Sequence, residues 1–252
     1  MSDRVLAALA DGVLTGTLNR PDKRNAIDTP MIDALYALLE RADLDAGVRV
    51  VALRGAGVDF CAGMDLKELL ASADETVERN RDAALHFGNL FVRMRRLPKP
   101  VVAVVQGRAL AGGCGLATAC DLVVATESAQ FGYPEVQRGF VPALVMNLLR
   151  RAVGEKVAFD LAATGRLLTA TEAAVVGLVS RVYEDSDFED QVGDVLRALA
   201  GSSATALAFT KQQFYQLDGL DFEAGIRLSA DVNAVSRTTP DFRSAIAAFL
   251  KK

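Results

Sequence analysis

Residues 100–135, PVVAVVQGRALAGGCGLATACDLVVATESAQFGYPE, constrain the fold more than any other part of the chain. The β-branched run Val101–Val105 is bounded by residues that interrupt strands, which predicts a buried strand. Gly112, Gly113 and Gly115 then crowd a turn, and the small apolar residues after them favour a helix. The first N–H groups of a helix are unpaired and favour negative charge. The segment therefore predicts an α/β fold with a turn that can stabilise an anion.

A second glycine turn, DFCAGMDL at residues 59–66, follows the strand-like run at residues 48–53. Two small-residue turns, each placed after an apolar strand, can direct two backbone N–H groups toward one oxygen atom. Together the two turns predict an oxyanion hole.

At these two turns the chain resembles the crotonase superfamily, the enoyl-CoA hydratase/isomerase family. AGMDL at residues 62–66 and AGGCGLATACDL at residues 111–122 stand where that family has its two signature loops, and the resemblance covers nearly the whole chain. It implies an α/β fold, the ClpP/crotonase-like spiral of ββα units with a C-terminal helical trimerisation region. Residues 1–200 would form the spiral core with the CoA and active site, and residues 201–252 the helical oligomerisation region.

Length and composition agree with that expectation. The chain has 252 residues, of which 51% are hydrophobic and 24% charged, which suits one large globular domain or a core with a small appendage. A net charge of −4 and a pI of about 5.2 provide no basic face for a nucleic acid or an anionic membrane. The N-terminus has no apolar signal core, and no apolar run approaches the ~20 residues of a membrane helix. We expect a cytoplasmic protein with neither nucleic-acid nor membrane partners.

Three cysteines, Cys61, Cys114 and Cys120, form an odd set without CxxC spacing. Neither a disulfide framework nor a metal site is expected from them. Cys114 near a helix start could act as a nucleophile only with a base, and the single histidine, His86, lies in the middle of an expected helix. We interpret Cys114 as a packing residue and His86 as a surface or structural residue.

Apolar periodicity and capping signals predict alternating strands and helices. Thr29 is the expected N-cap of a helix that begins with Pro30 and ends near Ala42. The expected strands are residues 13–18, 122–126, 130–131 and 178–183, and the other expected helices are residues 74–96, 204–216, 222–236 and 240–250.

The last three expected helices carry more apolar side chains than short helices bury among themselves. Phe209, Phe214, Ile226, Phe242 and Phe249 are examples. These side chains must be buried against another surface, which belongs either to their own subunit or to another copy of the chain. The family resemblance implies a homo-trimer, or a hexamer formed as a dimer of trimers.

The resemblance also implies the chemistry. An acyl-CoA thioester would place its carbonyl oxygen between the N–H groups of Met64 and Gly112, and Glu135 of the FGYPE segment would act as the acid/base. No cofactor is expected beyond the CoA moiety of the substrate, and no metal. By the same matching, the residues expected to contact CoA are Arg24, Ala26, Ala62, Asp65, Leu66, Leu110, Gly113 and Pro134.

The chain departs from the family pattern at Gly115, where two-glutamate hydratases have their second glutamate. A hydratase with both carboxylates holds water between them, whereas an isomerase needs one base. Residues 134–142 look like a methylglutaconyl-CoA-hydratase-like branch, so we expect an enoyl-CoA hydratase, a lyase of fatty-acid and lipid metabolism. An enoyl-CoA delta-isomerase is the alternative. A non-catalytic crotonase-fold binding protein is a third interpretation, and a ClpP-like hydrolase lacks a serine in the second glycine turn.

Overall fold

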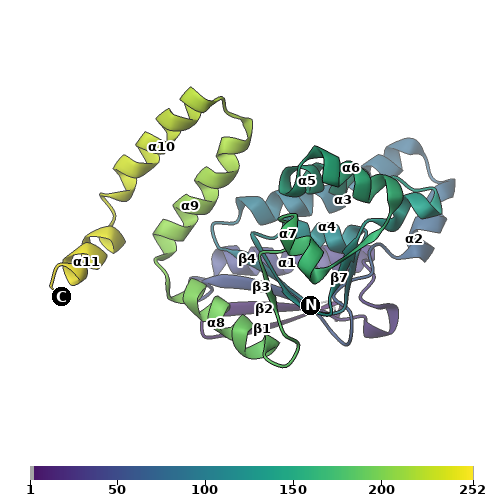
Figure 1. Cartoon of the computed structure of the whole chain (residues 1–252), viewed down its shortest axis with the longest axis horizontal. Helices are drawn as coiled ribbons and strands as arrows, with labels where there is room; N and C mark the ends of the chain where they lie inside the picture. The colour runs from purple at the N-terminus through teal and green to yellow at the C-terminus, as the bar shows by residue number, and fades with distance from the viewer. Residues whose placement is uncertain (1–2, 252) are drawn as a thin grey trace.

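The computed structural model describes residues 3–251 as an α/β core from which a helical arm extends (Figure 1). The main sheet has six strands in the order β1-β2-β3-β4-β6-β9, with β1 antiparallel to β2 and all other neighbours parallel. Its strands are β1 (Val5–Ala10), β2 (Val13–Leu18), β3 (Val50–Gly55), β4 (Val101–Val105), β6 (Leu122–Thr126) and β9 (Arg181–Tyr183). A smaller sheet orders β5 (Arg108–Leu110), β7 (Gln130–Gly132) and β8 (Leu167–Thr169).

Helices connect these strands and continue into the arm. They are α1 (Thr29–Leu44), α2 (Leu66–Ala71), α3 (Val77–Arg96), α4 (Gly112–Ala119), α5 (Ala143–Val153), α6 (Glu155–Thr164), α7 (Ala170–Val175), α8 (Phe188–Gly201), α9 (Ala204–Gln216), α10 (Phe222–Ser236) and α11 (Pro240–Phe249). The 3-10 turns are η1 (Pro21–Lys23), η2 (Ser72–Asp74), η3 (Pro134–Arg138) and η4 (Leu217–Gly219). Within residues 3–251, no helix combines the length and apolarity needed to cross a bilayer.

The sequence located β2, β4, β6, α9 and α10 at their observed bounds. The expected N-cap of α1 was wrong. Asp28, not Thr29, caps this helix, because its carboxylate accepts the N–H of Met31 at 3.0 Å. Thr29 is already helical, and the helix continues two residues past Ala42 to Leu44.

The central strand β4 is buried on both faces, which explains its unbroken β-branched sequence. Its odd-numbered residues belong to the larger apolar core, which includes residues of α1, α3 and α4. Val102 and Val104 face the other side, where they pack with Phe188 and Val192 of α8. The glycine turn after β4 is therefore attached to a strand fixed from both sides.

The arm consists of α9, α10 and α11, and in Figure 1 α10 and α11 stand clear of the main sheet. Helix α9 contacts α3, while α10 and α11 pack on α9. Large apolar side chains of the arm are exposed, namely Phe214, Leu217, Leu220, Phe222, Ile226, Val235, Phe242, Ile246, Phe249 and Leu250. The expected boundary between the core (residues 1–200) and the oligomerisation region (residues 201–252) falls at the last residue of α8. This division stays a prediction.

A buried ion pair attaches the root of the arm to the core. Lys211 of α9 lies 2.7 Å from the carboxylate of Asp121 and donates to the carbonyl oxygens of Met94 and Lys99 at 2.8 and 2.9 Å. The hydroxyl of Tyr215 donates to the same carboxylate at 2.8 Å. If α9 moved away from the core, the Lys211 charge would lose its partner, and an unpaired buried charge is strongly destabilising. The ion pair therefore anchors α9 on the core of its own chain.

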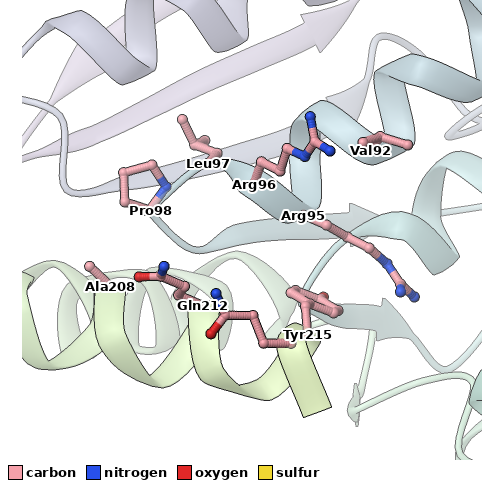
Figure 2. A pocket seen from close by; sticks show the side chains of 9 residues that line it. Val92, Arg95, Arg96, Leu97, Pro98, Ala208, Gln212 and Tyr215 are labelled. Atoms are coloured by element: carbon pink, nitrogen blue, oxygen red, sulfur yellow. The ribbon is translucent and has the colours of Figure 1, made fainter. Parts of the chain in front are cut away.

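A pocket of about 560 Å³ lies beside this root, between the end of α3 and α9. Figure 2 shows Arg95 and Leu97 on the α3 side and Gln212 and Tyr215 on α9. The guanidinium of Arg95 lies 4.5 Å from the centre of the Tyr215 ring. This pocket contains none of the predicted site residues, so it belongs to the arm and not to the candidate active site.

Candidate active site

The two glycine turns pack directly against each other. Gly63 has a φ of 102°, and a Cβ at this position would lie 2.9 Å from the Cβ of Ala111 and 3.4 Å from the nitrogen of Gly112. A Cβ on Gly113 would overlap the carbonyl oxygen of Cys61 and lie 2.6 Å from its Sγ. Glycine is therefore required at both contacts. The structure brings together the two segments that the sequence predicted would form one site.

Backbone pairing orients the N–H of Met64. The carbonyl oxygen of Gly63 accepts from the N–H of Ile27 at 2.8 Å, and the N–H of Asp65 donates to the carbonyl oxygen of Ile27 at 2.8 Å. In such a parallel bridge the polar groups of the intervening residue point to the opposite side. The N–H of Met64 is therefore directed away from Ile27. On its other side, the same segment pairs through Cys61 with β5, which leads into α4.

The second donor is the first residue of α4. Gly112 follows Ala111, whose φ of 51° and ψ of −126° are rare for a residue with a Cβ. The N–H of Ala111 donates to the carbonyl oxygen of Gly132 at 2.8 Å, which holds this conformation in place. The N–H of Gly112 belongs to the first helical turn, where intrahelical acceptors are lacking and the helix dipole favours an anion.

Glu135 approaches the same helix from β7. It is the second residue of η3, and β7 runs parallel to β5, the strand just before α4. Glu135 is only 9% exposed, and among residues 3–251 its Oε2 has no hydrogen-bond partner. Burial raises the pKa of Glu135, an effect that its own backbone N–H and the charge of Arg138 oppose. A buried carboxyl with a raised pKa, on a segment whose strand pairs with the one leading to the Gly112 N–H, can both accept and return a proton.

The raised pKa predicts a pH-dependent stability cost at Glu135. The folded state binds the proton more tightly than the unfolded state, so stability falls as pH rises from the ordinary glutamate pKa through the raised folded pKa. Glu135→Gln removes this cost. We expect its melting temperature to exceed that of the wild type at neutral pH, with the difference shrinking as pH falls below the ordinary glutamate pKa. Calorimetry across this pH range measures the effect, and a constant difference would contradict it.

The place of the missing second glutamate is occupied. A Cβ on Gly115 would overlap Cγ1 of Val145, lie 3.0 Å from its Cβ and contact Phe91 at 3.8 Å. Val145 comes from α5, a helix that sequence reasoning did not identify. No local signal marks Val145, because its contact with α4 joins residues thirty positions apart.

Several of the residues expected to contact CoA belong to the 61–66 segment or pair with it. The N–H of Ala62 donates to the carbonyl oxygen of Arg24 at 2.9 Å, and Leu110 donates its N–H to the carbonyl oxygen of Cys61 at 2.9 Å. Ala26 is partly buried, Leu66 is exposed at the start of α2, and Pro134 opens η3 directly before Glu135. Gly113 is fixed by its contact with Cys61.

Arg24 and Asp65 have different surroundings. The side chain of Arg24 is 59% exposed and lines a polar pocket of about 350 Å³ together with Arg108 and Gln130. The carboxylate of Asp65 instead pairs with Arg20 at 2.8 Å and caps α2 through the N–H of Lys67, and these partners lower its pKa. Its side chain therefore has a structural role. Sequence reasoning missed Arg108, which only the fold places beside Arg24.

The other titratable candidates are structural. Burial raises the pKa of the Cys114 thiol to about 12, so it is not a thiolate nucleophile. His86 lies 2.8 Å from Asp33 on the surface and stacks on Tyr36. Among the described residues, no group of three or more His, Cys, Asp or Glu side chains could hold a metal ion.

Comparison with known proteins shows the family and the fold. The family model described as enoyl-CoA hydratase/isomerase matches residues 9–252. A Thermus thermophilus protein named "Putative enoyl-CoA hydratase" is 43% identical over 93% of this chain and 93% of its own length. The 2,3-dehydroadipyl-CoA hydratase of Escherichia coli is 34% identical over 95% of this chain and 92% of its own length.

Solved structures show the same architecture. An enoyl-CoA hydratase of Mycobacterium smegmatis aligns with a TM-score of 0.95 and 32% identity over 99% of this chain and 97% of that one. The expected crotonase fold is confirmed, and it defines an α/β enzyme class with a C-terminal helical region. The chain belongs to the enoyl-CoA hydratase/isomerase family.

Proposed function

We propose that this enzyme is an enoyl-CoA hydratase that adds water to a 2-enoyl-CoA with a single carboxylate. The observation that carries the proposal is the buried Oε2 of Glu135, which has no hydrogen-bond partner among the described residues. Glu135 follows β7, which pairs in parallel with β5, the strand that leads into α4 and its Gly112 N–H. The names of the Thermus and Escherichia relatives support hydration as the reaction.

One carboxylate can carry out both proton transfers when the attacking water and the α-carbon both face it. Glu135 accepts a proton from water while the hydroxide oxygen bonds to the β-carbon, and the π electrons move to the thioester oxygen. The N–H groups of Met64 and Gly112 stabilise that oxyanion, with each donor contributing about 3 kcal/mol in the transition state. Protonated Glu135 then returns its proton to the α-carbon. The sum is the addition of one water molecule.

The polar pocket lined by Arg24 and Arg108 suits the phosphates of CoA. Arg24 and Arg108 supply positive charge there, and Ser128 and Gln130 supply neutral polar groups. The carboxylate of Asp59 also lines the pocket, 3.8 Å from Arg24, so it offsets part of this charge. We propose that this pocket binds the nucleotide end, which leaves the thioester to reach the two glycine turns. The enzyme then needs no cofactor beyond the CoA part of its substrate.

Double-bond migration is the second candidate reaction. The apolar Val145 in the place of a second carboxylate favours it, since an isomerase needs only one base to move a proton between the α- and γ-carbons. A relative that is 30% identical over the whole of this chain, from Escherichia coli, is named 1,2-epoxyphenylacetyl-CoA isomerase.

Three substrates separate the two reactions. A trans-2-enoyl-CoA, a 3-enoyl-CoA and 3-methylglutaconyl-CoA are supplied in turn, and the conjugated thioester absorbance is followed while products are identified by mass. Products that have gained one water, with little conversion of the 3-enoyl-CoA, are the expected result. Rapid migration without water incorporation would replace hydratase by isomerase. No reaction with any of the three would overturn the proposed function.

We also propose that the arm forms a homo-trimer or hexamer. Its exposed apolar side chains, such as Phe222 and Phe249, have no cover within the described chain. Light scattering at micromolar concentration is expected to give the mass of three or six chains. A form ending at Ser202 should assemble from fewer chains than the full-length protein. A monomeric full-length chain would contradict the proposal.

A further inference from the structure

We propose that Arg20 is a positioning residue for the Met64 donor of the oxyanion hole. Its guanidinium binds the 26–28 segment and also the carboxylate of Asp65, the residue directly after Met64. The inference rests on the proposed acyl-CoA chemistry. It goes beyond that chemistry by naming the side chain that keeps one of the two N–H donors in place.

The guanidinium of Arg20 binds two segments that are distant in the sequence. Its Nη1 donates to the carbonyl oxygen of Ala26 at 2.7 Å and lies 3.2 Å from Oδ2 of Asp28, while its Nη2 donates to Oδ2 of Asp65 at 2.8 Å. The Arg20 side chain is 12% exposed, and those of Asp28 and Asp65 are 5% and 14% exposed. Because a guanidinium is planar and rigid, these contacts fix the distance between the two segments.

Each of the two carboxylates is also held by a helix. Oδ1 of Asp28 accepts the N–H of Met31 at 3.0 Å in the first turn of α1. Oδ1 of Asp65 accepts the N–H of Lys67 at 2.9 Å in the first turn of α2. One oxygen of each carboxylate therefore binds a helix start and the other binds Arg20. The guanidinium links the N-termini of two helices across the segment that contains Met64.

The backbone pairing of Met64 is a single parallel bridge. The N–H of Ile27 donates to the carbonyl oxygen of Gly63, and the N–H of Asp65 donates to the carbonyl oxygen of Ile27, both at 2.8 Å. The bonds of this segment to β5 are made by Cys61, three residues before Met64. The orientation of the Met64 N–H therefore depends on the Ile27 edge, and Arg20 binds both sides of that edge.

The backbone around Arg20 is held independently of its guanidinium. The N–H of Arg20 donates to Oδ1 of Asn25 at 2.9 Å, and its carbonyl oxygen accepts the N–H of Asn25 at 2.8 Å. Asn25 is fully buried, and its Nδ2 donates to the carbonyl oxygens of Ala56 and Asp59 at 2.8 Å. An apolar side chain at residue 20 should therefore keep this turn and remove only the guanidinium contacts.

A bound enolate reports on the oxyanion hole without turnover. A 3-ketoacyl-CoA, such as acetoacetyl-CoA, forms an enolate when its α-proton is released to the buffer, and the near-ultraviolet absorbance of the enolate distinguishes it from the keto form. The enolate oxygen carries the negative charge that the Met64 and Gly112 N–H groups would stabilise. The ratio of enolate to keto form in the saturated complex therefore measures the donors directly.

Arg20→Met is expected to lower both kcat and this enolate ratio by about 10- to 100-fold, while KM and the dissociation constant of free CoA stay within about threefold of the wild type, because a misplaced donor is lost mainly in the charged state. Arg20→Lys keeps the charge but cannot bind three acceptors, so we expect an intermediate loss. Arg93→Met is the matched control. It removes an ion pair of 2.8 Å between α3 and Asp43 of α1, and its kcat and enolate ratio should equal those of the wild type.

Asp65→Asn tests the same contact from the other side. The amide oxygen can still accept the N–H of Lys67, but the ion pair with Arg20 is lost, so we expect a smaller decrease in kcat and in the enolate ratio. Arg20→Met should then cost less in this background than in the wild type, because both changes break one contact. If Arg20→Met does not fold, Arg20→Lys and Asp65→Asn carry the test.

The outcomes separate this inference from the proposed function. Arg20 variants that hydrate enoyl-CoA and stabilise the enolate like the wild type would overturn the positioning role alone. A fall in melting temperature without a fall in the enolate ratio, or equal losses of kcat and CoA affinity, would also overturn it and reduce Arg20 to general support of the fold. A wild type that stabilises the enolate but converts no enoyl-CoA would refute the proposed hydration and leave the role of Arg20 intact.

Discussion

Glu135→Gln is expected to lower kcat by about 10³, because the amide can neither accept a proton from water nor return one to the α-carbon. The amide keeps nearly the same shape, so the packing of η3 is retained. CoA affinity should stay near the wild-type value, since the proposed phosphate contacts are at Arg24 and Arg108. Steady-state turnover gives kcat, and α-proton exchange in deuterated water follows the proton transfer. Calorimetric titration with CoA measures the CoA affinity.

Glu127→Gln is the matched control. Glu127 is exposed just after β6, so its loss should leave turnover unchanged. If Glu135→Gln keeps activity within about tenfold of the wild type, a loss too small for the removal of an acid/base, Glu135 does not hold that role.

Gly112→Pro is expected to lower kcat by about 10² to 10³, because proline has no N–H to donate to the thioester oxygen. Gly112 is the first residue of α4, a position that tolerates proline in a helix. The unusual backbone of Ala111 makes a folding check necessary, since the residue before a proline is restricted. Circular dichroism and melting temperature provide it.

Gly112→Ala separates the missing donor from the added bulk. Alanine keeps the N–H, and its Cβ would lie 3.4 Å from Met64 and from Phe87, a tight contact with two side chains. We expect this variant to retain most of its activity. Equal losses in the two variants would assign the effect to bulk, and a folded Gly112→Pro protein with near-normal turnover would remove Gly112 from the oxyanion hole.

Local chemistry explains which parts of the fold were predictable from the sequence. The β-branched run of β4 and the Thr239 cap with Pro240 of α11 act within a few residues, so their bounds could be inferred. Asp28 and Thr29 are both good N-caps, and the choice between them depends on how the chain enters α1. Asp28 also forms ion pairs with Arg4 and Arg20, contacts that a local sequence pattern does not reveal.

The candidate site was predictable in its glycines and less so in its side chains. Gly112 and Gly113 stood out because few other residues permit such close backbone approach. The burial of Glu135 was not predictable, since a glutamate after a proline in a loop is usually solvated. The pairing of Asp65 with Arg20 and of Gly115 with Val145 joins distant segments, which no local pattern encodes.

The pairing of the 61–65 segment on both edges has a consequence for its dynamics. One edge bonds to Ile27 and the other to β5, while Gly113 presses on Cys61 from the helix start. Such a segment has no hinge of its own, so it cannot open while its neighbours stay closed. Its hydrogen-bonded amides, those of Cys61, Ala62 and Asp65, should exchange with solvent as slowly as those of β4. The proposed oxyanion hole would then be part of the rigid scaffold, and access for the substrate would depend on the segments around it.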